Sequence, residues 1–342
     1  MTFLNEILQQ PNALLNLLNK YMDDKTSTKA LIDTINNSGC KEFIFTGMGS
    51  SYYAGFVACA LLQKNGIKAH AYESKEFASY GLHTLNENTV IFVVSQSGEC
   101  KELIDLFPLL QHKENVFVIT NNENSSLYNN ECVKFMLYAG NEVTTSTKTY
   151  TNTVAVMLFI CEAILQYFNK PNSDFSSLII KCSKIMQEVI NNGAGQMVRF
   201  FDNADYICLV GSGPSYCTAN HCELVIEEAG KMFSTRYRPA QFLHGPVELI
   251  NEKFNIIAFD FSDDTRDEID RIIDNELAYN GKICVITNRV LKNQSDRMMS
   301  IKLDIQNEFY SPLVEVIPVE LFINELALNR GLKPGVLERV RK

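Results

Sequence analysis

A short pattern that occurs twice constrains the fold of this chain more than any other feature. Residues 47–52 read GMGSSY and residues 211–216 read GSGPSY, an offset of 164 (211 − 47). The segment VITN occurs at 118–121 and again at 285–288, an offset of 167 (285 − 118). Two separate matches at nearly constant offset indicate an internal duplication. The length of 342 residues also favours two domains over one core.

Both copies show strands that alternate with helices, which indicates a mainly parallel sheet covered on both faces. We therefore predict an α/β fold with two tandem doubly wound parallel-sheet domains related by duplication. In the first copy, strands are expected at 43–46, 68–72, 90–94, 116–120 and 135–138, before a long buried helix over 149–168. The expected parts are N-terminal helices over 1–29 (Pro11 opening a second helix), a first domain over 30–168, connecting helices over 169–194, a second domain over 195–331 and a tail over 332–342.

Residues 90–99, VIFVVSQSGE, predict a strand, a hydroxyl-rich turn and the start of a helix that runs to Leu110. The first turn of a helix has unpaired N–H groups and a partial positive charge, which attract an anion. Ser95, Gln96 and Ser97 can donate further hydrogen bonds, and Gly98 lets the backbone come close. These neutral donors suit a sugar phosphate that must leave again. The alternative is an ordinary N-capped helix.

The Gly47-x-Gly49 turn also invites comparison with the dinucleotide-binding fingerprint. The third glycine of that fingerprint is replaced by Tyr52 here, and by Tyr216 in the second copy. That glycine permits close packing of helix against strand, so a tyrosine argues against NAD or FAD. We expect no cofactor. Ser50 and Ser51 instead add two hydroxyls to the anion site.

The overall composition excludes some classes of function. The net charge of −9 argues against a nucleic-acid binder, which usually has a basic face. The longest apolar run, 154–161, is far shorter than the roughly 20 residues of a membrane span, and the N-terminus does not resemble a signal peptide. The ten cysteines form no CxxC pair and no metal-like cluster with histidine. We therefore expect reduced thiols, no metal, and a cytoplasmic protein.

A helix over 215–231 carries the first candidate for acid–base chemistry. Glu228 lies seven residues after His221, so the two share a face with Val225 between them. Acids on surface helices are usually only solvated. This helix follows the repeated glycine turn, however, so its face could line a ligand crevice. A partly desolvated carboxylate there could act as a proton-transfer base.

His244-Gly245-Pro246 is the second candidate. Pro246 favours an extended Gly245, so we expect His244 on a fixed loop, where histidines often serve in acid–base chemistry. The counterpart of the Ser95 loop in the second copy is 260–264, DFSDD, which is acidic and unsuited to an anion. We therefore expect the first domain to bind phosphate and the second to supply another function. The basic end, 333–342, is either a frayed tail or a cationic strap over an anionic ligand.

Together these residues resemble a known family. The whole chain is similar to the tandem sugar isomerase (SIS) domain proteins, in particular the isomerase half of glutamine–fructose-6-phosphate aminotransferase. The matching pieces, in the family's order, are GSSY at 49–52, SQSGE at 95–99, AGNE at 139–142 leading to STK at 146–148, and HGP at 244–246. The chain begins directly at the sugar domain, so we expect no amidotransferase domain.

The resemblance implies a role for most of these residues. Ser51, Ser95, Gln96 and Ser97 would hold the sugar phosphate. Glu228 would shuttle a proton between C1 and C2 through an enediol or enolamine. The resemblance also implies that His244 opens the sugar ring from the neighbouring subunit, so we expect a homodimer. The substrate-binding set that we expect is Gly49, Ser50, Ser51, Ser95, Gln96, Ser97, Cys100, Ser146, His221 and Arg339.

The chain departs from the family at four places. Cys100 replaces the threonine after Ser-Gly-Glu, and the segment between Glu142 and Lys148 is one residue shorter. On the catalytic helix, the family's glutamate, lysine and glutamate become His221, Val225 and Glu228. Arg339 aligns near the family's terminal lysine, and an arginine does not form a Schiff base at ordinary pH. Because these changes remove amine-handling groups, we do not expect amino-sugar synthesis.

Two functions remain. The first is a phosphosugar or amino-phosphosugar isomerase or deaminase that transfers a proton between C1 and C2. The second is a non-catalytic, regulatory sugar-phosphate-binding protein, a role that SIS domains also serve. Proton exchange at C2 of a bound ketose phosphate would separate the two.

Overall fold

The computed structural model describes residues 1–193, 195–202, 204–293 and 295–339. By its internal contacts the chain forms two compact units, which are described separately. The first-sheet unit comprises Asn12–Asn141 and Lys148–Ile180, and the second-sheet unit comprises Met1–Pro11, Glu142–Thr147 and Lys181–Lys342. The short segment Glu142–Thr147 therefore belongs to the unit that contains the second sheet.

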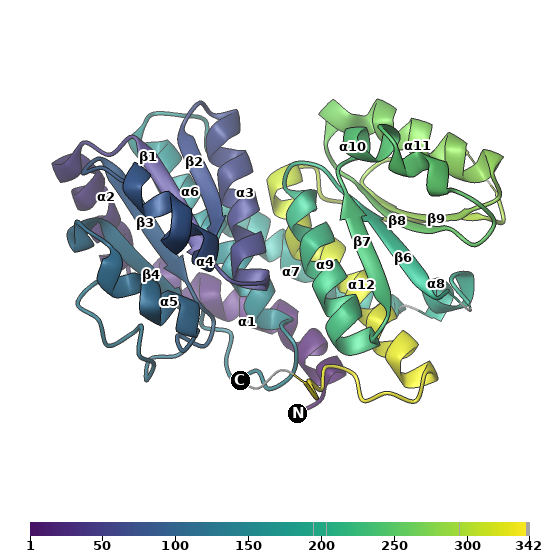
Figure 1. Ribbon diagram of the computed structural model, residues 1–342, viewed down its shortest axis with the longest axis horizontal. Helices are drawn as coiled ribbons and strands as arrows, with labels where there is room; N and C mark the ends of the chain where they lie inside the picture. The colour runs from purple at the N-terminus through teal and green to yellow at the C-terminus, as the bar shows by residue number, and fades with distance from the viewer. Residues whose placement is uncertain (194, 203, 294, 340–342) are drawn as a thin grey trace. The chain divides into compact units, whose positions relative to one another are not determined.

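The first-sheet unit contains a five-stranded parallel sheet in the order β2-β1-β3-β4-β5 (Figure 1). Its strands are β1 (Glu42–Gly47), β2 (Lys68–Glu73), β3 (Thr89–Val94), β4 (Val116–Thr120) and β5 (Val133–Met136). Its helices are α2 (Thr26–Ser38), α3 (Ser50–Lys64), α4 (Ser74–Glu76), α5 (Lys101–Leu106) and α6 (Lys148–Tyr167), with parts of α1 (Phe3–Asp23) and α7 (Phe175–Asn192).

The second-sheet unit repeats this topology in the order β7-β6-β8-β9-β10, also parallel throughout. Its strands are β6 (Tyr206–Val210), β7 (Phe233–Tyr237), β8 (Asn255–Asp260), β9 (Lys282–Thr287) and β10 (Met298–Lys302). Its helices are α8 (Gly195–Phe200), α9 (Ser215–Gly230), α10 (Pro239–Leu243), α11 (Arg266–Ala278) and α12 (Ser311–Asn329). The same strand order in both sheets confirms the predicted α/β fold and the tandem duplication.

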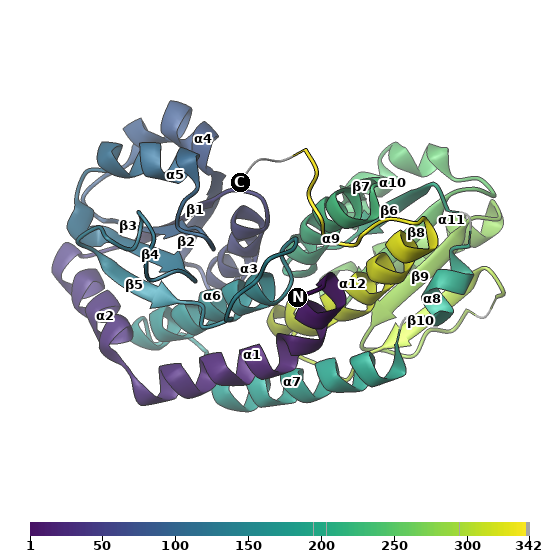
Figure 2. The same cartoon turned by 90° about the horizontal axis from the view of Figure 1, so that it is seen from below.

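Alternating side chains bury both faces of each sheet, because successive residues of a strand point to opposite sides. In the first sheet, Ile44, Ile91 and Val118 pack against α5, whereas Phe45 and Phe92 stack on the other face with ring centroids 4.9 Å apart. In the second sheet, Ile256 and Val285 pack against α10 and α11. Helices α9 and α12 pack against each other on the face of the second sheet opposite to α11 (Figure 2).

Gly47 and Gly211, which open the two repeated turns, are required for the same steric reason. A Cβ on Gly47 would lie 3.0 Å from the backbone carbon of Ser51, and a Cβ on Gly211 would lie 2.6 Å from the backbone oxygen of Ser215. In each copy the first turn of the following helix passes directly over the glycine. Only glycine permits this close approach.

Two local expectations are wrong. Helix α1 continues through the buried Pro11 instead of restarting there, and the chain breaks only after Asp23. A proline in a helix interior loses one hydrogen bond, but here buried residues on both sides, such as Ile7 and Leu14, hold the helix together. Helix α5 has only six residues and passes into a 3₁₀ turn at Phe107–Leu109 instead of running from Glu99 to Leu110. Pro108 lies in that turn.

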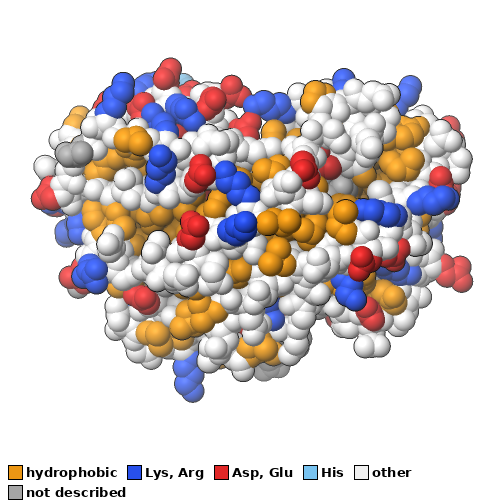
Figure 3. All heavy atoms as spheres, turned by 180° about the vertical axis from the view of Figure 1, so that it is seen from behind, with side chains coloured by type: hydrophobic (Ala, Val, Ile, Leu, Met, Phe, Trp, Pro, Cys, Tyr) orange, Lys and Arg blue, Asp and Glu red, His pale blue; other side chains and the backbone are white. Residues whose placement is uncertain are grey.

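Among the described residues, α6 is the one helix long and apolar enough to cross a membrane, and 89% of its apolar stretch is buried inside the protein. A core helix of this kind passes the same test, so α6 is weak evidence for a membrane span. All ten cysteines are free thiols, and only Cys100 and Cys132 are half-buried instead of buried. Acidic and basic side chains are interspersed on the face in Figure 3. The cytoplasmic location stays a prediction.

Candidate active site

The predicted phosphate-binding residues lie at the point where the strand order of the first sheet reverses. Strands β1 and β3 are neighbours, and Gly47 pairs with Val94 at their carboxyl ends. The loops that follow, with Gly49 to Ser51 on one and Ser95 to Cys100 on the other, therefore leave the same edge of the sheet. In open α/β sheets, ligands bind in the crevice at this position.

Hydrogen bonds fix the shape of the Ser95 loop. The N–H of Gly98 donates to the Oγ of Ser95 at 3.1 Å, and the N–H of Glu99 donates to the Oγ of Ser97 at 3.2 Å. Both hydroxyl oxygens therefore already act as acceptors. Neither hydroxyl proton has an acceptor in the part of the chain that the structure describes, so both are available to an oxyanion.

Gly98 is required in this loop for two reasons. Its φ is +67°, and a Cβ there would lie 2.0 Å from Ser125 Oγ. Glu99 anchors the loop from outside, since its carboxylate accepts hydrogen bonds from the N–H and the Oγ of Ser126, both at 2.7 Å. These bonds lower the pKa of Glu99. The carboxylate thus acts as a structural anchor.

Cys100 caps the short helix α5 without a hydrogen bond to its backbone. Its thiol donates to Glu102 Oε2 at 3.1 Å, and burial raises the pKa of the thiol to about 11. The side chain is therefore a neutral thiol directed toward Glu102. Because α5 is so short, an anion bound at this loop would depend more on the loop hydroxyls than on the helix dipole that we expected to contribute.

Glu228, the predicted base, lies on α9 in the second-sheet unit and is half-buried. Its Oε2 accepts a hydrogen bond from Thr145 Oγ1. Thr145 is itself held by the tail, since its N–H donates to the carbonyl of Gly335 at 3.1 Å. Thr145 was not predicted from the sequence, where its one signal is its place in the shortened segment before Lys148.

The segment Glu142–Thr147 is tied to α1 and closed on itself by hydrogen bonds. Glu6 accepts hydrogen bonds from the N–H of Val143, at 2.7 Å, and from the hydroxyl of Thr144. Glu142 accepts from the N–H and the hydroxyl of Thr147, each at 3.0 Å. Ser146, predicted to bind substrate, is half-buried within this segment.

The tail passes along the same part of the second-sheet unit. Lys231, just after α9, donates to the carbonyl of Val336 at 3.4 Å. Arg339, predicted to bind substrate, is exposed. The last three residues of the predicted strap, 340–342, lie outside the described residues.

His221 is fully buried between α9 and α12, with its Nε2 3.5 Å from Glu320 Oε1. Burial lowers the pKa of His221 to about 3 and raises the pKa of Glu320 well above its usual value. His221 is therefore neutral near pH 7. This side chain packs inside the unit, so we assign it a structural role on this evidence; its predicted part in substrate binding stays untested.

His244 is exposed at the end of the short helix α10. Gly245 has φ +151° and ψ −59°, not the extended conformation that we expected before Pro246. This backbone region favours glycine, so Gly245 turns the chain sharply after the histidine.

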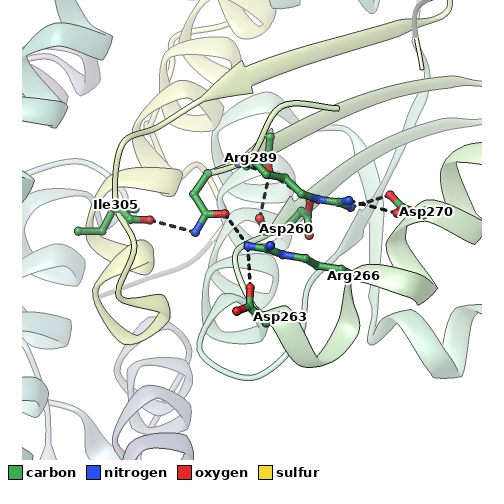
Figure 4. Close-up of polar contacts among 8 residues, drawn as sticks. Asp260, Asp263, Arg266, Asp270, Arg289 and Ile305 are labelled. Atoms are coloured by element: carbon green, nitrogen blue, oxygen red, sulfur yellow. Dashed lines mark hydrogen bonds and ion pairs between the residues drawn. The ribbon is translucent and has the colours of Figure 1, made fainter. Parts of the chain in front are cut away.

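The loop of the second copy differs as predicted. Strand pairing matches Ile119 with Val94 in one sheet and Ile286 with Phe259 in the other, so Asp260 takes the place of Ser95. Figure 4 shows the guanidinium of Arg289 between Asp260 and Asp270, with closest contacts of 2.6 Å to each.

This arrangement leaves no uncompensated positive charge on Arg289. A second pair lies beside it, with Arg266 Nη2 2.7 Å from Asp263 and 3.1 Å from Asn288 Oδ1 (Figure 4). Arg266 and Arg289 are thus each paired with acids beside this loop, whereas the loop of the first copy offers unpaired hydroxyl donors. In the described part of the chain, no three His, Cys, Asp or Glu side chains are placed to hold a metal ion.

The fold and the loops define a tandem pair of doubly wound α/β domains with a donor-rich loop in the first copy only. The SIS domain family model matches residues 38–164 and 200–330. These matches cover most of the chain, which therefore belongs to the SIS domain family. The matched ranges fall within or close to the two expected domains, whose exact boundaries stay a prediction.

Known relatives extend the comparison. The chain is 25% identical over 343 residues to glutamine–fructose-6-phosphate aminotransferase (isomerizing) of Geobacillus kaustophilus, covering 96% of this chain and 55% of the relative. It thus spans about half the length of such relatives. Among solved structures, the C-terminal domain of glucosamine-fructose-6-phosphate aminotransferase from Francisella tularensis is 22% identical with a TM-score of 0.83, covering 98% of each chain. Tagatose-6-phosphate ketose/aldose isomerase from Escherichia coli is 19% identical with a TM-score of 0.80, covering 100% of this chain and 97% of its own.

Proposed function

We propose that this chain is an enzyme that binds a phosphosugar or amino-phosphosugar and transfers a proton between C1 and C2. The loops at Gly49–Ser51 and Ser95–Ser97 would hold the phosphate, with Cys100 at their edge. The proposal is supported by the unpaired hydroxyl donors of Ser95 and Ser97 and by the names of the relatives, which act on sugar phosphates.

Glu228 would act as the base. One carboxylate oxygen is held by Thr145, which leaves the other to take the proton from the carbon next to the carbonyl. The electron pair of the broken C–H bond forms the C1–C2 double bond as the carbonyl oxygen takes up a proton, which gives an enediol, or an enolamine for an amino sugar. Return of the first proton to the other carbon, with loss of a proton from the oxygen or nitrogen on the carbon that was first deprotonated, completes the isomerisation. For an amino sugar, water would then release the amine. No oxidant or reductant is needed.

The observation that carries this proposal is the held, half-buried carboxylate of Glu228. His244 would assist ring opening, and its exposure on a short turn supports a role across a dimer interface. Val225 and the buried His221 offer no amine-binding group on this face of α9, which favours isomerisation, deamination or amine release over amino-sugar synthesis.

The test compares Glu228→Gln with Glu227→Gln, its exposed neighbour on the same helix. Turnover on a panel of hexose and amino-hexose phosphates should fall about 10²–10⁴-fold in Glu228→Gln, the range of general-base catalysis, while KM changes little. Glu227→Gln should retain activity. Equal activity in both variants would remove Glu228 from the mechanism. Sugar-phosphate binding by a wild-type protein without turnover would favour the regulatory alternative.

A further inference from the structure

Thr145 makes a contact that the resemblance does not assign. Its hydroxyl donates to Glu228 Oε2, and its backbone N–H donates to the carbonyl of Gly335. It is almost fully buried, with 1% of its surface exposed. A single residue of the Glu142–Thr147 segment thus connects the tail to the carboxylate of α9.

A glutamate side chain has several rotatable bonds and loses considerable freedom when it is fixed. A free Glu228 would spend most of its time away from the geometry in which it can take a proton from carbon. A hydrogen bond to one carboxylate oxygen restricts the side chain and orients the other oxygen. Since proton transfer requires the base within hydrogen-bond reach of its proton, this orientation acts on the rate.

The donor itself is well fixed. Val143 and Thr144, directly before Thr145, are bound to Glu6, and Thr147 is bound to Glu142. The bonds to Glu6 tie the segment to α1, the bond from Thr145 N–H to Gly335 ties it to the tail, and the bonds between Thr147 and Glu142 close the segment on itself. A hydroxyl on such a support can hold a carboxylate in one orientation.

We propose that Thr145 is a positioning residue that orients Glu228 for proton transfer between C1 and C2. The inference rests on the proposed function, because it assigns Glu228 the role of base. Thr145 itself does not need to touch the substrate. Its effect should therefore appear in kcat and not in KM.

The test uses Thr145→Val, which keeps the shape of the side chain but removes the hydroxyl, and Thr145→Ser, which keeps the hydroxyl. We expect Thr145→Val to lower kcat about 10–100-fold, the effect of losing one hydrogen bond to a charged group, with KM within about threefold of the wild type. Thr145→Ser should restore most of the rate. In a Glu228→Gln background, Thr145→Val should cause no further loss, because the group it orients is gone.

Three results would overturn the inference while leaving the proposed function intact: full kcat in Thr145→Val, an equal loss in Thr145→Val and Thr145→Ser, or an undiminished further loss in the Glu228→Gln background. A melting temperature within a few degrees of the wild type would show that Thr145→Val folds. A wild-type protein that turns over no phosphosugar would instead count against the proposed function.

Discussion

At the scale of single residues, Glu276 is an acid that burial keeps protonated at neutral pH. Glu276 on α11 is fully buried, and burial raises the pKa of its carboxyl to about 9. There is no room beside it, since a Cβ on Gly281 would lie 2.1 Å from its Oε1. Such a group makes stability depend on pH.

Glu276→Gln should weaken the dependence of the free energy of unfolding on pH. Between the usual glutamate pKa of 4.5 and about 9, the folded state keeps a proton that the unfolded state has released. The free energy of unfolding therefore decreases as pH rises through this window, by at most about 1.4 kcal/mol per pH unit from this group. Urea unfolding from pH 5 to 9 should show a shallower decline for Glu276→Gln than for the wild type. Parallel declines would contradict the buried, protonated Glu276.

The sequence was most informative at residues whose chemistry depends on local pattern. Gly98 was predicted to let the backbone come close to an anion, which stays a prediction; the structure shows a positive φ there and a close approach to Ser125 instead. Thr145 was not predictable, because its partner Glu228 lies 83 residues away. The burial of His221 was missed as well, since helical spacing shows which residues share a face but not what α12 places against that face.

At the scale of elements, the contact between the C-terminal tail and the Glu142–Thr147 segment can be tested directly. Gly335 has φ +73°, and a Cβ there would lie 2.8 Å from Thr144 Cβ and 3.2 Å from Phe3 Cβ. Gly331, in the same tail, has φ +70° with open space around an added Cβ. Both glycines have a left-handed φ that would strain any residue with a Cβ, and they differ in what such a Cβ would contact.

We expect Gly335→Ala to displace the tail from Thr145 and lower kcat, with a loss of about 2–4 kcal/mol in the free energy of unfolding from strain and overpacking together. Gly331→Ala should lose only about 1–2 kcal/mol from strain and keep its activity. Chemical unfolding and steady-state kinetics measure both effects. If the two variants behave alike, the contacts of Gly335 with the Glu142–Thr147 segment have no bearing on catalysis.

The positions of most helices and strands followed from the pattern of hydrophobic residues. The five strands of the first sheet and the helices α6 and α9 begin and end within two residues of their expected ends. Predictions failed at α1 and α5. The proline in α1 is tolerated because tertiary packing outweighs one lost hydrogen bond, and α5 ends early because Pro108 constrains the backbone at its C-terminal end.

At the scale of the whole molecule, duplication and divergence are the main result. Both sheets share one strand order, but Ser95 of the first copy is replaced by Asp260, whose carboxylate pairs with Arg289. The offset of the repeats revealed the duplication, and the loop sequences revealed the divergence. Neither the repeat offset nor the loop sequences predict the number of subunits, because subunit assembly depends on the surface of the folded protein.

If His244 serves the neighbouring subunit of a homodimer, two inactive variants should restore activity to each other. In a mixed dimer of Glu228→Gln and His244→Ala, one site would receive both wild-type residues. Random mixing should then recover about a quarter of wild-type turnover, because half of the dimers are mixed and each has one intact site. Light scattering would give the number of subunits. An inactive mixture of proteins shown to have exchanged subunits would place His244 in its own chain's site.

Exchange of the hydrogen at C2 in deuterated water tests the central claim most directly. Wild-type protein incubated with the phosphosugar that binds it best should incorporate deuterium at C1 or C2, detected by loss of the corresponding proton signal in NMR. Glu228→Gln should bind the same sugar and incorporate almost none. Exchange that persists at the wild-type rate in Glu228→Gln, or none in a wild-type protein saturated with every binding sugar, would contradict this account.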